Sequence, residues 1–467
     1  MTSAWILTAA LGVIAPAATA QDRLSTADDQ TDLALTVYGN GLALVRDRRE
    51  VDLPIGVKEL AISGVSPQMI ADSLDLDLGP DVRVLTRTLR PANLNPRSLL
   101  EAHLGKPAQL IRRHPETGAE TVVAATPVSL QGGVIARIGG RLVSNPEGRW
   151  AFPSMPPHLR AEPVLAVRAE SASAGARPIG LGYLAGGVSW RPAYTANWDR
   201  KAGKIRLSAW AVLKNSSAMD FGNARVKVVA GQVRRVSAAP RPAPRAALMM
   251  KAEAAQDAGL AVRESFAGYH LYDLPQRVSL KRGDEVHAAL LKPLTVEVRH
   301  ELVSEGHPAV FGRVRGGAPR PTHPAIRLTF QNPKDDAAQP LPAGTMRLYG
   351  ADSGGTAQFM GEDRIGDVPV GGEVMVNAGN AFDVTVKRRQ TDFRRENRDN
   401  FEAAFAIDLQ NGGAEAASVK VVESLPGDWR MADTDKPHTR ENNQAVWRVV
   451  VPARGTLSFS YRVAVRN

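Results

Sequence analysis

The stretch FEAAFAIDLQN (401–411) alternates apolar and polar residues and decides the fold class of the chain. A period of two places the apolar side chains on one face of a β-strand and the polar ones on the other. The same alternation returns at 447–451 and at 457–465. These strands predict that residues 378–467 form a C-terminal immunoglobulin-like β-sandwich. The core-facing residues of the first strand are Phe401, Ala403, Phe405, Ile407 and Leu409.

A phrase of this kind occurs three times in the chain. An alternating strand ends at an asparagine, a polar turn follows, and a second alternating strand begins; the asparagines are Asn215, Asn332 and Asn411. Each copy predicts a hairpin-like unit of an antiparallel sheet. Residues 161–377 are therefore predicted to form a central β-sandwich domain. A segment at 234–264, rich in Ala, Pro and Arg and lacking alternation, interrupts that domain and is predicted to be a mobile linker.

The N-terminal part of the chain contains shorter strands. Alternating apolar residues predict an N-terminal β domain over 21–92. A short helix follows, with Asn95 as its cap, Pro96 as its first residue and Gly105 as its stop. Very short strands separated by glycine-rich turns then predict a small β-barrel domain over 93–160. The predicted fold class is thus all-β and multidomain.

The composition is that of a folded protein with several hydrophobic cores. The chain has 467 residues, 43% of them apolar and 23% charged, which is enough for about three domains at roughly 150 residues each. It has no cysteine, which excludes disulfides, thiol catalysis and Cys-ligated metal centres. Its formal net charge of +10 favours anionic partners, such as lipopolysaccharide or phospholipid.

Residues 1–20 have the pattern of a secretory signal peptide. An apolar run begins at Trp5, and ATA at 18–20 gives the small-x-small pattern that predicts cleavage before Gln21. An uncleaved anchor is the alternative, but the run is short for a membrane span of ~20 residues. The mature chain is therefore expected in the periplasm or at the peripheral outer envelope, without a transmembrane segment. Nucleic acid is not an expected partner of such a protein.

Six phrases of the chain stand out together and in this order: YLAGGVSWRPAYTANWD (183–199), AWAVLKNSSAMDFGNARVKVVAGQV (209–233), YHLYDLP (269–275), LPAGTMRLYGADSGGTAQFMGEDRIGDVPVGGEV (341–374), GNAFDV (379–384) and ESLPGDWR (423–430). Together they resemble the bacterial family called domain of unknown function 4139. The resemblance runs from about Ile179 to the C-terminus and implies a secreted β protein of the cell envelope, with no established reaction and no catalytic residues to assign. The segment at 37–67 also resembles the N-terminal β module of mucoidy-inhibitor-type relatives, which carry a coiled coil where this chain has the predicted barrel.

Two features invite a catalytic interpretation. GADSGG (350–355) is similar to the sequence around the nucleophile of chymotrypsin-like proteases, but no companion histidine motif precedes it. Asp, Ser and Gly are the residues of tight turns, so this stretch is predicted to be a polar hairpin turn. The 9 histidines of the chain have none of the spacings of metal sites. We therefore expect no metal and no other cofactor.

Four aromatic residues lie close together in a chain otherwise poor in them. Exposed rings of this kind suit a sugar-stacking platform. Three of the four share strand parity, which favours instead a stripe that faces the core, with Pro192 marking an edge or a bulge. The residues are Tyr183, Trp190, Tyr194 and Trp198.

A run of cations near the start of the C-terminal domain is the second candidate site. Clustered guanidinium groups bind phosphate or carboxylate through paired hydrogen bonds, which would make the run an anion-binding surface. The favoured alternative is a charged hairpin end or edge strand that repulsion keeps soluble. The residues are Lys387, Arg388, Arg389, Arg394, Arg395 and Arg398.

These observations favour a non-enzymatic secreted scaffold that binds an anionic envelope component or an envelope protein. The alternative is an envelope hydrolase that acts on polysaccharide or peptide, with a site assembled from residues distant in the sequence. The two differ in geometry: a hydrolase needs a pocket with converging carboxylates or a Ser/His pair, whereas a scaffold presents flat sandwich ends and edges.

Overall fold

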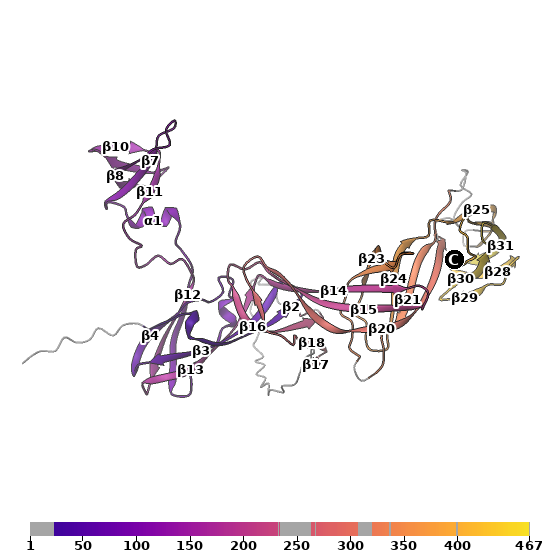
Figure 1. The fold of residues 1–467 in the computed structure, drawn as a ribbon, viewed down its shortest axis with the longest axis horizontal. Coiled ribbons are helices and arrows are strands. Elements are labelled where there is room, and N and C mark those ends of the chain that lie inside the picture. The colour runs from indigo at the N-terminus through magenta and orange to yellow at the C-terminus, as the bar shows by residue number, and fades with distance from the viewer. Residues whose placement is uncertain are drawn as a thin grey trace, which may run out of the picture.

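The computed structural model describes residues 23–231, 233, 263–266, 268–306, 320–335, 338–397 and 400–466. The predicted signal peptide and most of the predicted linker lie outside these residues; 263 and 264 belong instead to strand β17 (Arg263–Phe266). The described part of the chain is nearly all β, which confirms the predicted class, and it has no helix long and apolar enough to cross a bilayer. Figure 1 shows the sheets following one another along an elongated molecule.

Four successive segments repeat one arrangement of five strands, which we call a unit. Within each unit the first strand pairs antiparallel with the second, the second with the fifth, and the third with the fourth. The long strand β20 (Glu285–Gly306) serves as both the fifth strand of unit II and the first strand of unit III.

Unit I consists of β2 (Gln30–Tyr38), β3 (Leu42–Leu53), β4 (Gly56–Ile62), β12 (Val164–Ser171) and β13 (Gly175–Gly186). Unit II consists of β14 (Val188–Asp199), β15 (Lys204–Asn215), β16 (Phe221–Ala230), β19 (Val278–Leu280) and β20. Unit III consists of β20, β21 (Ala325–Gln331), β22 (Gly344–Ala351), β23 (Ala357–Ile365) and β24 (Glu373–Asn380). Unit IV consists of β25 (Val384–Arg395), β26 (Asn400–Asn411), β27 (Ala417–Ser424), β30 (Gln444–Val451) and β31 (Thr456–Arg466).

The remaining elements lie before β2 or between the third and fourth strands of a unit. They are β1 (Arg23–Ser25), β5 (Asp75–Asp77), β6 (Val82–Arg90), β18 (Tyr269–Asp273), β28 (Asp428–Thr434), β29 (Thr439–Glu441) and the 3-10 helices at Ala27–Asp29 and Ala71–Ser73, besides β17 and an insertion in unit I.

Consecutive units share a sheet. The third strand of each later unit lies parallel to the first strand of the unit before it: β16 beside β2, β22 beside β14, and β27 beside β20. The sheets are therefore mixed, not purely antiparallel as predicted. The sharing also joins β2 and β3, from the predicted N-terminal domain, to strands of the predicted central domain. Figure 1 shows the resulting row, with β16 beside β2 and β14 beside β15.

Apolar faces of the paired sheets form the core of each unit. In unit IV, Phe405 and Ile407 of β26 share a core with Val421 of β27 and Trp447 of β30. The predicted core face of 401–409 is confirmed, since all its apolar residues are buried. Burial of this face stabilises the unit by roughly 25 cal/mol for each Å² of apolar surface removed from water.

The three asparagine phrases are crossovers between sheets, and the prediction that they are hairpins is wrong. In each copy the strand that ends at the asparagine and the strand that follows it have different pairing partners. Asn411 is buried, and its side-chain amide donates to the carbonyls of Glu415, Val451 and Pro452 at 2.8, 3.3 and 3.1 Å. The amide therefore joins two connections between the sheets: the one after β26 and the one before β31.

Asn215 and Asn332 hold the same place in units II and III. Asn215 donates to the carbonyls of Met219, Leu280 and Lys281, and Asn332 to those of Gln339 and Pro369. In all three units, the second strand pairs with the fifth up to one last residue, and the asparagine is the residue directly after it. In unit I the equivalent residue is Pro54, because the last pair between the second and fifth strands joins Leu53 to Gly175. Proline has no side-chain amide, so unit I lacks this connection.

The insertion in unit I contains helix α1 (Pro96–Ala102) and five short strands. The helix is confirmed with its predicted cap, since Asn95 accepts from the backbone N–H of Ser98. The strands form an open sheet in the order β10-β9-β8-β7-β11, and between residues 93 and 160 no pairing joins β10 to β11. The predicted small β-barrel is therefore wrong, since this sheet does not close. The strands are β7 (Ala108–Arg113), β8 (Glu120–Ser129), β9 (Ile135–Ile138), β10 (Arg141–Ser144) and β11 (Arg149–Ala151).

Candidate functional site

Strand β25 carries the predicted run of cations and forms one edge of the last sheet, whose order is β25-β26-β31-β28. Lys387, Arg389, Arg394 and Arg395 are exposed on this strand. Arg398 lies outside the described residues. Because side chains alternate between faces along a strand, Lys387 and Arg389 point to the outer face, away from the core of unit IV. The structure thus brings most of the predicted cations to one edge.

Arg388 differs from its neighbours because it points inward. Its Nε lies 2.7 Å from Oε1 of Glu423, and its Nη2 donates to the carbonyl of Ser304 at 2.9 Å. The side chain of Glu423 is 1% exposed. Gly306 has no side chain, and a Cβ there would collide with the Glu423 carboxylate. The ion pair therefore joins the three strands β25, β27 and β20, and Arg388 is not available to an external anion.

Burial raises the pKa of the Glu423 carboxyl above its ordinary value, while the Arg388 guanidinium lowers it. The favourable partner therefore does not fully offset the loss of water around the carboxylate. Such a pair is held in place by geometry, and removing one partner leaves an uncompensated buried charge.

The exposed cations of β25 have acidic neighbours across the sheet but few direct partners. Lys387 lies opposite Asp408, and Arg394 lies opposite Glu402. Asp392 is paired with Arg462 of β31 at 2.7 Å. Within the described part of the chain, no ion pair involves Lys387, Arg389, Arg394 or Arg395. These four cations are therefore available at the edge.

A second charged cluster lies on the other sheet of unit IV. The hydrogen bonds from Arg448 (2.7 Å) and Thr439 (2.9 Å), with Lys420 at 3.1 Å, lower the pKa of Glu441 to about 2. The folded state therefore holds this carboxylate ionised more strongly than the unfolded state does.

The contribution of Glu441 to stability should be complete above its ordinary pKa of 4.5 and should be lost as the pH falls towards about 2. Replacing Glu441 with glutamine is expected to flatten the dependence of melting temperature on pH across this window. Melts followed by circular dichroism between pH 6 and about 2.5 test this. A variant that loses stability with acid as steeply as the wild type would contradict it. Solvent screening keeps the effect small, since this side chain is 35% exposed.

The four aromatic residues are buried, with Tyr183 and Tyr194 at 0% and 1% exposure. Trp190 donates from Nε1 to the carbonyl of Val229 at 3.0 Å, and the Tyr194 hydroxyl donates to the carbonyl of Pro342 at 2.7 Å. Trp198 is 8% exposed and packs against His300. The structure places these rings in the core and leaves no open face on which a sugar would stack.

The stretch at 350–355 is the turn between β22 and β23. Oδ1 of Asp352 accepts from the backbone N–H groups of Gly354 and Thr356 at 3.0 and 2.9 Å, and Oδ2 accepts from Gln358 at 2.9 Å. These bonds lower the pKa of Asp352, that of Gln358 most. The aspartate therefore stabilises its own hairpin. Among the residues described, no group of three or more His, Asp or Glu side chains could hold a metal ion.

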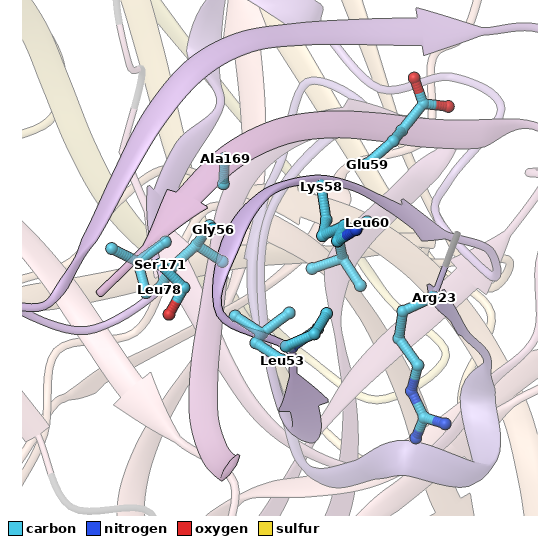
Figure 2. Close-up of a pocket in the computed structure, with 11 residues that line it drawn as sticks. Arg23, Leu53, Gly56, Lys58, Glu59, Leu60, Leu78, Ala169 and Ser171 are labelled. Atoms are coloured by element: carbon cyan, nitrogen blue, oxygen red, sulfur yellow. The ribbon is translucent and has the colours of Figure 1, made fainter. Parts of the chain in front are cut away.

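A small hollow lies in unit I beside Pro54, near the point where the other units have their asparagine. Its cavity volume is about 20 Å³, little more than one water molecule needs, and it is lined largely by aliphatic side chains; Figure 2 shows Leu53, Leu60 and Arg23 around it. Two of its polar groups have partners elsewhere: Glu59 pairs with Arg90 at 2.6 Å, and Ser171 donates to the carbonyl of Ser173 at 2.7 Å. The Ser171 hydroxyl and the Glu59 carboxylate are thus not paired as a nucleophile and a base.

Two features of the site were not evident from the sequence. The partner of Arg388 is Glu423, from a different sheet, and a second buried pair joins Asp47 and Arg49 at 2.8 Å in unit I. One indication of this pair is present in the sequence: strand parity places Arg388 on the same face as Val384 and Val386. Strand parity identifies the face of a residue but not the residue opposite it across a core.

The comparison with known proteins agrees with the phrases quoted from the sequence. No match to the chain is found among curated proteins. A family model described as "Domain of unknown function (DUF4139)" matches residues 179–467, which include units II, III and IV and most of the last strand of unit I. The match covers more than half of the chain, and the protein therefore belongs to this family.

Proposed function

We propose that the protein is a non-enzymatic scaffold of the cell envelope, secreted to the periplasm or the peripheral outer envelope, where it binds an anionic component or another envelope protein. One observation carries the proposal: the exposed cations of β25 lie at the edge of the last sheet in a row of linked units. The net charge of +10 supports an anionic partner. As part of the same proposal, the paired sheets of the units are immunoglobulin-like sandwiches.

Local geometry supports a scaffold over a hydrolase. At the turn of Asp352 and in the hollow beside Pro54, the side chains of Asp352, Glu59 and Ser171 bond to neighbouring groups of the fold. Rows of repeated units present extended binding surfaces.

Crosslinking from chosen positions tests the proposal. A photo-reactive amino acid at position 389 of the full chain, in envelope fractions of the native host, is expected to give discrete adducts. The same amino acid at Arg430, exposed on β28 at the opposite edge of the same sheet, serves as the matched control. Adducts that are equally frequent at both positions, or absent from both, would contradict binding at the β25 edge.

A further inference from the structure

We call the place where two consecutive units share a sheet a joint. At each joint the third strand of the later unit lies parallel to the same part of the first strand of the earlier unit. On β14, residues 193–198 pair with β22; on β2, residues 34–38 pair with β16; on β20, residues 302–306 pair with β27. These are the C-terminal parts of the three first strands. The joint is therefore a regular feature of the repeat.

The corresponding part of β25 is identified by the register of unit IV. Val384 lies opposite Asn411 as Val188 lies opposite Asn215. Counting from these pairs, residues 193–198 of β14 correspond to about 389–395 of β25, allowing for the bulge between Gln390 and Asp392. Among the described residues only Thr322 pairs with the outer side of β25, at Val386. Within the described ranges, no strand therefore lies beside 389–395 as a third strand does at the other joints.

The backbone of β25 indicates which groups face outward at this edge. The N–H and C=O of Val386 both bond to Thr322, at 2.8 and 2.9 Å, so they point away from β26. Because backbone groups alternate in direction along a strand, those of Arg388 and Gln390 point the same way. An incoming strand would find donors and acceptors there.

From these positions we infer that the edge of β25 at 389–395, which no described strand covers, binds an extended acidic segment of a partner protein as a parallel β-strand. This inference rests on the proposed function and names the class of its partner. Arg389 and Arg394 would face the acidic side chains of the added strand, whose alternate apolar side chains would lie beside Gln390 and Phe393. Cations and a bulge discourage indiscriminate pairing at an edge, and the same cations select an acidic strand.

A second copy of the chain fits the edge less well. The strand of unit I that would enter such a joint is β4, and it already lies parallel to β1 over Leu60–Ile62. In β4 the charges of Lys58 and Glu59 cancel, so it offers no surplus of acid to the cations of β25.

The probe for this inference is a fluorescent heptapeptide of alternating glutamate and valine, titrated into the full-length protein at low salt. Its control is the same peptide with the central valine replaced by proline, which keeps the charge and removes a strand N–H. We expect saturable binding of the first peptide by anisotropy, and at least a tenfold higher Kd for the second. Equal affinities would overturn the inference, because charge alone would then explain binding.

Variants of the protein locate the site. Arg389→Glu with Arg394→Glu is expected to raise the Kd at least tenfold, whereas Arg206→Glu with Arg430→Glu, an equal charge change at exposed positions, should leave it within about twofold. Gln390→Pro removes an edge-facing N–H without changing charge and should also weaken binding. Peptide affinity that is unchanged in the Arg389/Arg394 variant and in the Gln390 variant overturns the inference.

Other occupants would give different results. Wild-type protein that ignores the peptide but binds phosphatidylglycerol vesicles through Arg389 and Arg394 would assign the edge to a lipid surface. Self-association that the same substitutions abolish would assign it to a second copy. Either result overturns the acidic strand. Crosslinks at position 389 that persist in these cases would retain the proposed scaffold function.

Discussion

Replacing Arg388 with alanine is expected to lower the free energy of unfolding by about 3–5 kcal/mol, because it leaves the Glu423 carboxylate buried without its partner. Urea unfolding followed by tryptophan fluorescence measures this. The loss should shrink at acidic pH. Without the guanidinium the pKa of Glu423 rises further, so the folded state binds a proton that the unfolded state does not, and stability falls as the pH rises above 4.5.

The matched control for this prediction is Arg389→Ala, one residue along the same strand. Arg389 is exposed and lies on the outer face, so its replacement should change stability by less than about 0.5 kcal/mol. Equal effects of the two substitutions would show that Arg388 and Glu423 are not paired as described.

Replacing Asn411 with alanine is expected to cost about 2–4 kcal/mol, since the carbonyls of Glu415, Val451 and Pro452 lose a common donor. Asn411→Asp should cost more, because a carboxylate cannot donate to these carbonyls and repels them. The measurement is again urea unfolding, with Gln410→Ala as the control on the exposed side of the same strand.

Replacing Asn215 with alanine should destabilise unit II in the same way, since its amide donates to three carbonyls at the equivalent positions of that unit. An alanine at either position that unfolds with wild-type stability would contradict the role given to the repeated asparagine.

The sequence predicted those features of the fold that depend only on residues close together in the chain. Alternation identified the buried face of β26, and a cap, a proline and a glycine identified α1. It did not predict pairing, because alternation is a property of one strand and pairing is a relation between two. The asparagine phrases were therefore taken for hairpins, although the strand after each asparagine pairs in another sheet.

The sequence did not predict that unit I is a copy of the repeat, for two further reasons. Pro54 replaces the asparagine that marks the other units, and the insertion with α1 and its five-stranded sheet separates β4 from β12. Of the candidate site, the run of cations was predicted from its clustering in the sequence, with an edge strand as one of two alternatives. The inward turn of Arg388 towards Glu423 was not predicted, since these residues meet only when two sheets pack together.

Hydrogen exchange along β25 tests the central claim, that the edge of this strand at 389–395 accepts an added strand. In the free full-length protein, segment 387–395 should exchange faster than segment 191–199 of β14, because β14 has strand partners on both sides there. Adding the alternating glutamate–valine peptide should slow exchange in 387–395 and leave 191–199 unchanged. Equal protection of the two segments without peptide, or no change in 387–395 with it, would contradict the account.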